Sequence, residues 1–238
     1  MLQNMKPNRI ILWLAEDEFP RRDSDLPEKL LCLKKYGLEI MYCENLRSFK
    51  KLIPALRACP DADIVTADDD LYYRRNWLRT LYDEHSRHPE DVCVHRITKF
   101  YVDDSGQFRI IGGGYDVYPC PSFLNKLTGG AGAFYSPGML HPDVVRTELF
   151  TSLCTTNDDI WFWLMAVLNG KRIRPAEGRH PHLALAYVGD TQKGPTLCSL
   201  NDKGENLFWK DFYRVLEHYP ELEHILRSEY ERMKSIEA

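Results

Sequence analysis

The sequence lacks the features that mark several large classes of protein. Its longest apolar run, Ile160–Leu168, is far shorter than the ~18 residues that a membrane-spanning helix needs. The N-terminal segment Met1–Pro7 has no apolar core, which argues against a signal peptide. The 31 Lys and Arg residues are outnumbered by 35 Asp and Glu residues, whereas a general nucleic-acid binder carries a basic excess. We therefore expect no transmembrane segment and no nucleic-acid partner.

Paired cysteines and common nucleotide-binding signatures are also missing. The seven cysteines include no C-x-x-C pair, and their odd number leaves at least one without a disulfide partner. We therefore expect mostly small buried thiols in a reducing compartment, and a cytoplasmic location. No G-x-x-x-x-G-K-[ST] loop is present, and Gly112–Gly114 lacks the context of a dinucleotide fingerprint.

The first hundred residues alternate between segments of strand and helix character. Strands are expected at Arg9–Leu14, Leu38–Cys43, Ala62–Ala67 and Val92–His95, and helices at Leu26–Tyr36, Leu46–Leu56 and Asn76–His85. Two strand–helix–strand units in succession predict parallel strands with right-handed crossovers. The second half is more irregular, and two helices, Phe208–Tyr219 and Leu222–Met233, lie near its end. We predict an α/β fold in one domain, with a Rossmann-like, mostly parallel sheet and helices on both faces.

Three consecutive carboxylates, Asp68, Asp69 and Asp70, directly follow the expected strand Ala62–Ala67. They would repel one another without a cation, and ligands of open α/β sheets bind at the carboxyl ends of the strands. Carboxylate oxygens suit Mg²⁺ or Mn²⁺, which also bind phosphate oxygens. The alternative is a cap, in which Asp69 or Asp70 accepts from a helix that begins near Tyr72. One aspartate is enough for a cap, so three favour a metal site.

A glycine-rich segment leads into another expected strand, Ala133–Tyr135. Its Gly129, Gly130 and Gly132 would let the backbone approach a phosphate or a sugar closely. A flexible turn into the strand is an equally good interpretation.

A second pair of acids begins a predicted helix that ends at Leu168. Asn157 is a suitable N-cap, and Asp158 and Asp159 in the first turn complement the helix dipole. The helix is apolar almost all round, so we expect it to be buried with its acidic end facing a cleft. A carboxylate in such a position can act as a general base, and the dipole and catalytic interpretations both stay open.

In this order, the motifs resemble a bacterial family 2 glycosyltransferase of the GT-A fold. The resemblance is carried by Asp68–Asp70, His95–Arg96, Gly129–Gly132 and Asp158–Trp161. It implies an enzyme of polysaccharide biosynthesis that moves a sugar from a nucleoside diphosphate sugar to a glycan or glycolipid acceptor, with inversion. It also implies Mn²⁺ or Mg²⁺ as cofactor, and a cytoplasmic protein that contacts the inner membrane through its acceptor.

The resemblance assigns residues to the donor side of the site. Asp68 and Asp70 match the family's D-x-D motif, with Asp69 between them. Asp70 would bind the metal that bridges the donor's two phosphates, and Asp68 would contact the metal or the ribose. His95 and Arg96 would lie beside the metal site, on a phosphate.

On the acceptor side, the resemblance makes Asp159 the base that removes the proton of the acceptor hydroxyl, with Asp158 as the other member of the acid pair. Gly129, Gly130 and Gly132 would line the floor under the donor and acceptor sugars. Within the single domain of residues 1–238, this gives a donor and metal-binding half (1–96), an acceptor-side half (97–200) and C-terminal helices (201–238).

The resemblance is incomplete at the N-terminus, because the family's first strand and helix have no counterpart before Lys6–Arg9. An upstream start, a partner chain that supplies the strand, or a decayed relative would each explain this. We expect the edge of the sheet to be exposed and to favour self-association. Two other functions stay open: an inactive transferase-like protein with a binding role, and a metal-dependent phosphohydrolase or nucleotidyltransferase.

Overall fold

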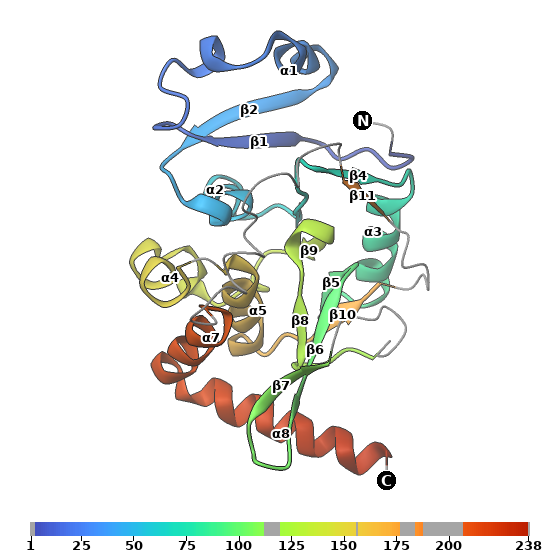
Figure 1. Cartoon of the computed structure of the whole chain (residues 1–238). Coiled ribbons are helices and arrows are strands. Elements are labelled where there is room, and N and C mark those ends of the chain that lie inside the picture. Colours follow the sequence, from blue (N-terminus) through green and yellow to red (C-terminus); the bar gives the residue numbers. More distant parts are fainter. Residues whose placement is uncertain (1–2, 112–119, 156, 177–183, 188–206, 238) are drawn as a thin grey trace.

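In the described part of the chain, four small open sheets form the framework of the fold (Figure 1). The computed structural model describes residues 3–111, 120–155, 157–176, 184–187 and 207–237. One sheet pairs β1 (Ile10–Ala15) with β2 (Leu38–Cys43), and another pairs β11 (Ala184–Tyr187) with β4 (Leu71–Tyr73). The central sheet has the spatial order β10 (Ile173–Pro175), β5 (Val92–Val94), β9 (Ala133–Tyr135) and β3 (Ile64–Val65). The remaining sheet has the order β7 (Phe108–Ile111), β6 (Ile97–Val102) and β8 (Asn125–Leu127). The mixed α/β class predicted from the sequence is confirmed.

The prediction of one mostly parallel sheet is wrong. Parallel pairing joins β1 to β2 and β5 to β10, whereas β9 runs antiparallel to both β3 and β5. The first strand–helix–strand unit therefore has the expected parallel strands. The second does not, because β3 pairs with β9 and not with β2. The insertion of β9 beside β3 brings the glycine-rich segment next to the triple aspartate.

The pair β1–β2 forms a separate unit at one end of the molecule (Figure 1). The strands are joined by the 3-10 helix Arg22–Asp25, by α1 (Glu28–Leu31) and by the 3-10 helix Cys32–Tyr36, which stops at Gly37 with φ +94°. Every residue of the two strands except Ala15 is only half-buried. Parallel sheets are normally covered on both faces, so the β1–β2 pair is unusually exposed to solvent.

The main hydrophobic core surrounds α5 (Asp158–Leu168), whose residues from Ile160 to Val167 are fully buried. The helix packs against β8, α7 (Leu207–His218) and α8 (Pro220–Glu237), while α4 (Thr147–Leu153) contacts α7. A smaller cluster lies between α3 (Trp77–Arg87) and strands β5 and β9. The burial of α5 predicted from its sequence is confirmed.

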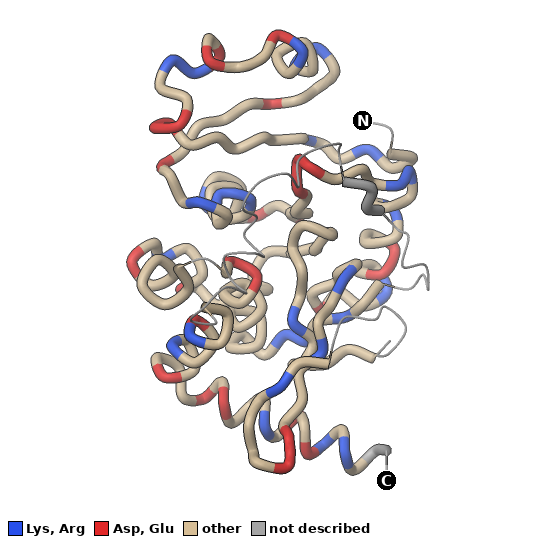
Figure 2. The backbone as a smooth tube through the Cα atoms, viewed as in Figure 1, with Lys and Arg blue, Asp and Glu red and all other residues tan. Residues whose placement is uncertain are grey.

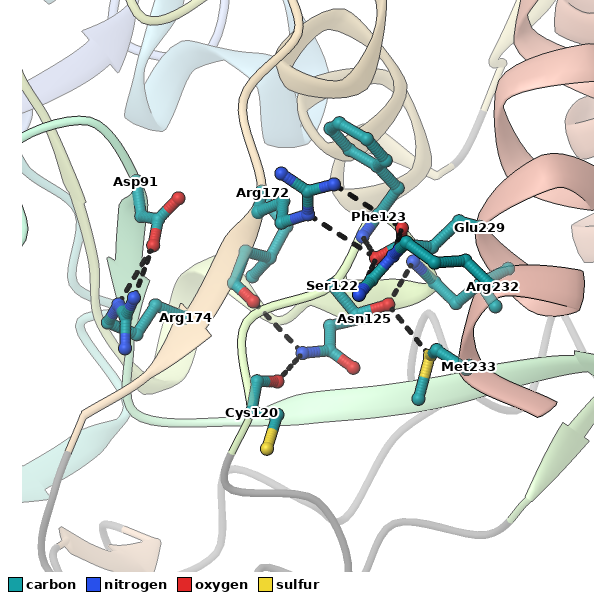
Figure 3. Close-up of polar contacts among 12 residues, drawn as sticks. Asp91, Cys120, Ser122, Phe123, Asn125, Arg172, Arg174, Glu229, Arg232 and Met233 are labelled. Carbon is teal, nitrogen blue, oxygen red and sulfur yellow. Dashed lines mark hydrogen bonds and ion pairs between the residues drawn. The ribbon is translucent and has the colours of Figure 1, made fainter. Parts of the chain in front are cut away.

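Helix α8 is held against the sheets by a buried carboxylate, Glu229 (Figure 3). Its oxygens accept hydrogen bonds from Arg232 at 2.8 Å and from Arg172, beside β10, at 3.4 Å. Burial raises the pKa of Glu229, but the two arginines outweigh burial and hold the pKa at about 2. The charge on Glu229 thus ties the C-terminal helix to the central sheet. In the described ranges, no helix has the length and apolar character that crossing a bilayer would require.

Candidate functional site

The triple aspartate forms the connection between β3 and β4. The segment after it, Leu71–Tyr73, is a strand, and the next helix, α3, begins only at Trp77. The alternative of a helix cap near Tyr72 is therefore wrong. Figure 2 shows acidic segments immediately before β4 and at the start of α5.

Of the three aspartates, Asp68 lies closest to the other candidate site residues. Its Oδ1 lies 3.0 Å from Nζ of Lys51, and about a third of its side chain is exposed. Its backbone N–H donates to the hydroxyl of Tyr73 at 2.7 Å, and that hydroxyl donates to the carbonyl oxygen of Gly130 at 2.5 Å. Tyr73 thus fastens the aspartate turn to the glycine-rich segment.

The glycine-rich segment forms a buried 3-10 turn over Gly129–Ala131, directly against Asp68. The hydroxyl of Thr66 donates to the carbonyl oxygen of Gly129 at 2.9 Å. A Cβ on Gly130 would overlap the Asp68 carboxylate, so only glycine allows this approach. The interpretation of a merely flexible turn does not account for this packing.

Gly132 turns the chain from this loop into β9 with a φ of +118°. A Cβ at Gly132 would lie 2.7 Å from Nε1 of Trp77, which donates to the carbonyl oxygen of Ala131 at 2.7 Å. The backbone N–H of His95 donates to the carbonyl oxygen of Gly132 at 3.0 Å. Gly132 is therefore held in place by Trp77 of α3 and by His95, which follows β5.

His95 is buried beside this turn, whereas its neighbour Arg96 is exposed. Nε2 of His95 is 2.9 Å from the carbonyl oxygen of Trp77, so Nε2 carries the proton of that hydrogen bond. Burial lowers the pKa of His95 to about 4, which keeps the ring neutral. The contacts of the His95 side chain in the described residues are those of a packing residue.

The acid pair begins α5 as predicted and faces the glycine turn. Oδ1 of Asp159 accepts from the backbone N–H of Gly129 at 2.9 Å, and Oδ2 lies 3.8 Å from Nζ of Lys126. Asp158 is buried, with Oδ2 at 3.3 Å from Nζ of Lys51. Burial raises the pKa of Asp158, although the ammonium of Lys51 opposes this shift.

Asn157 occupies the N-cap position of α5, but the prediction that its side chain caps the helix is wrong. Its Nδ2 instead donates to Oδ2 of Asp211, a fully buried residue of α7, at 2.8 Å. This contact fixes the start of α5, and with it the acid pair, against α7.

Lys51 is the functional residue that sequence analysis missed. It ends the 3-10 helix Arg47–Lys51, before α2 (Ile53–Ala58), and its ammonium contacts both Asp68 and Asp158. Burial lowers its pKa, but the carboxylates of Asp158, Asp159 and Asp68 outweigh burial and hold the pKa well above its usual range. A lysine on a predicted helix is ordinarily solvated, so no sequence signal distinguished it from Lys50.

The aspartate turn has the chemistry of a site for a hard divalent cation. Burial raises the pKa of Asp70, and the negative charges of Asp68 and Asp69 raise it further. A divalent cation bound by carboxylate oxygens would relieve this repulsion, so the donor set fits Mg²⁺ or Mn²⁺. Asp69 is exposed. In the parts of the chain that the structure describes, no three His, Cys, Asp or Glu side chains already converge as a ligand set.

No protein-family model matches the chain, and no curated protein matches it. We therefore infer the function from the residues of the site.

Proposed function

We propose that the chain is a glycosyltransferase that moves a sugar from a nucleoside diphosphate sugar to a hydroxyl group of a glycan or glycolipid acceptor, with a divalent cation and with inversion. One observation carries the proposal: the carboxylates of Asp68 and of Asp158 meet at Lys51, beside Gly129 and Gly130. A donor-side acid and an acceptor-side acid pair at one backbone turn are what such a transfer needs.

On the donor side, Asp68 and Asp70 would hold Mg²⁺ or Mn²⁺. The bound cation supplies Lewis-acid stabilisation of the negative charge that develops on the departing nucleoside diphosphate. Because Gly130 has no side chain, its backbone lies directly against the Asp68 carboxylate, and this contact holds the carboxylate at the glycine turn.

On the acceptor side, Asp159 is the better general base of the two acids. The N–H of Gly129 orients one oxygen of its carboxylate, and about a quarter of the side chain is exposed. Asp158 is buried and paired with Lys51. Asp159 would take the proton of the acceptor hydroxyl as that oxygen attacks the anomeric carbon opposite the leaving diphosphate. Such a base contributes typically about 10²–10⁴-fold to the rate.

The first experiment is a calorimetric titration of the purified chain with a panel of nucleoside diphosphates, with and without Mn²⁺. We expect one nucleotide to bind in a Mn²⁺-dependent manner, and this nucleotide identifies the base of the donor. If none binds under either condition, the transferase proposal fails.

Two substitutions separate the donor and acceptor roles. We expect Asp70→Ala to abolish Mn²⁺-dependent nucleotide binding, because it removes a cation ligand. We expect Asp159→Asn to leave nucleotide binding unchanged and to reduce sugar transfer about 10²–10⁴-fold, because it removes the base. Asp61→Asn, an exposed change outside the site, is the control for both.

The outcomes also distinguish the other functions. Hydrolysis of a nucleotide without any acceptor, unaffected by Asp159→Asn, would indicate a phosphohydrolase. Nucleotide binding with no transfer in the wild-type protein would indicate a binding role. Equal loss of nucleotide binding in Asp70→Ala and Asp159→Asn would contradict the division between the donor and acceptor sides.

A further inference from the structure

Lys51 contacts carboxylates from both sides of the proposed site. Its ammonium lies 3.0 Å from Oδ1 of Asp68 and 3.3 Å from Oδ2 of Asp158. The side chains of Lys51 and Asp158 are 19% and 10% exposed, so water screens this ion pair only partly. The ammonium therefore already occupies a position at Asp68 that a divalent cation would need.

The surrounding chain keeps Lys51 in this position. The residues that follow it, Leu52 and Ile53, are fully buried and anchor its backbone. The stem of Lys51 lies beside Gly129, because a Cβ added to Gly129 would be 3.7 Å from the Cδ of Lys51. Lys50 is the adjacent lysine, but its Nζ pairs with Glu18 at 2.8 Å, away from the site. Two neighbouring lysines thus have different roles, and Lys50 is a matched control.

A buried hydroxyl lies in the same electrostatic environment. Tyr135, on β9, is 1% exposed, and its hydroxyl has no hydrogen-bond partner among the described residues. Burial raises its pKa, and the charges of Asp159, Lys51 and Asp158 all act on it. The Tyr135 hydroxyl is thus a buried polar group without a described partner, close enough to this cluster for the charges of the cluster to act on it.

We propose that Lys51 is the resident counter-cation of the site. In the donor-free protein its ammonium neutralises Asp68 and competes with a divalent cation for that carboxylate. When the cation takes over Asp68, the ammonium is available for the donor's diphosphate. The diphosphate contact rests on the proposed function, whereas the competition rests on the ion pair alone.

Competition predicts opposite effects of one substitution on two ligands. In Lys51→Gln, the charge that repels a second cation is gone, so we expect Mn²⁺ alone to bind about tenfold more tightly. The same variant lacks a positive charge for the diphosphate, so we expect nucleoside diphosphate, titrated at saturating Mn²⁺, to bind about tenfold more weakly. A residue that only supports the fold would weaken both interactions.

The test is a Mn²⁺ titration of wild-type protein, Lys51→Gln, Lys51→Arg and Lys50→Gln, followed by the paramagnetic resonance signal of free Mn²⁺. We expect Lys51→Arg and Lys50→Gln to bind Mn²⁺ like the wild type, because the first keeps the charge and the second removes a charge outside the site. Thermal unfolding checks that each variant is folded. If Lys51→Gln is unfolded, Lys51→Met, which keeps the length of the stem beside Gly129, replaces it.

Unchanged or weaker Mn²⁺ binding without the Lys51 charge would overturn the proposal, as would the absence of Mn²⁺ binding in every variant. Unchanged nucleotide binding in Lys51→Gln would overturn the diphosphate contact. Tighter Mn²⁺ binding in Lys51→Gln, with no nucleotide bound by any protein, would support the counter-cation and reject the transferase.

Discussion

At the scale of single residues, the geometry of the site depends on two glycines. Gly130 leaves space for the Asp68 carboxylate, and Gly132 leaves space for the indole of Trp77 while adopting a φ of +118°. Both therefore act by the absence of a side chain, which lets one turn contact the aspartate segment on one side and α3 on the other.

We predict that Gly132→Ala destabilises the protein by about 2–4 kcal/mol, as the sum of left-handed backbone strain and overpacking against Trp77. The control is Gly138→Ala, since Gly138 also has a positive φ, +75°, but nothing lies within 4 Å of an added Cβ. Gly138→Ala should therefore lower the stability by only the backbone strain, about 1 kcal/mol. Urea unfolding of the three proteins measures the difference, and equal losses in the two variants would show that Trp77 does not limit position 132.

The sequence alone predicted the residues that meet at the site better than the contacts that hold them. Asp68, the glycine turn and the acid pair, which only the resemblance grouped into one site, lie together in the structure. The contacts of Lys51 and Tyr73 were not foreseen, because Lys51 lies on an expected helix and Tyr73 lies between expected elements, and neither has a pattern that marks it as part of the site. The side chain of Asn157 bonds to Asp211 and not to the helix, since a partner distant in sequence outcompetes the local cap.

At the scale of elements, the positions of several strands were predictable, whereas the position of β4 and the pairing of β3 were not. Ile64 and Val65 are apolar and bounded by polar residues, which is enough to predict a strand. Their partner, β9, lies some seventy residues later in the chain and runs antiparallel to them. A two-residue strand contains no information about direction, so a local strand–helix–strand pattern gave the wrong neighbour.

We predict that the β1–β2 unit opens more readily than the central sheet. Both strands are half-buried and neither belongs to a described hydrophobic cluster, whereas β5 and β9 are fully buried. A two-stranded sheet is only marginally stable by itself, so its amides should exchange with deuterium at least about tenfold faster than those of β5 and β9.

Native-state hydrogen exchange at several protein concentrations measures this difference. The concentration series also addresses the expected self-association through the sheet edge, because pairing between copies would slow exchange in β1 as concentration rises. Protection in β1–β2 equal to that of β5, at low concentration, would contradict the prediction.

At the scale of the whole molecule, stability depends on polar groups buried between elements. Glu229 joins α8 to the central sheet as an anion, and His95 joins β5 to α3 as a neutral ring. These two groups respond differently to pH. The pKa of Glu229 is held at about 2, so the stability that its charge contributes is complete above about pH 4.5 and is lost as the pH falls toward 2. His95 affects stability at higher pH, between about pH 6.5 and pH 4.

We predict that His95 makes the folded protein less stable as the pH falls from 6.5 to 4. The unfolded chain takes up a proton on this residue near pH 6.5. The buried ring, with its pKa lowered to about 4, stays neutral until lower pH. Stability from this residue is thus fully present above pH 6.5 and is lost on acidification, by about 3 kcal/mol in total at pH 4.

His95→Gln isolates this contribution, because glutamine keeps a donor for the carbonyl oxygen of Trp77 but does not titrate. Urea unfolding at pH 7, 6, 5 and 4 should give a wild-type stability that falls by about 1 kcal/mol per pH unit more steeply than that of the variant between pH 6 and 4. Above pH 7 the two curves should run parallel. Other buried groups, including His85, whose pKa burial also lowers, act equally in both proteins and cancel in the difference. Parallel curves throughout would mean that His95 has the same pKa in the folded and unfolded states and would contradict the prediction.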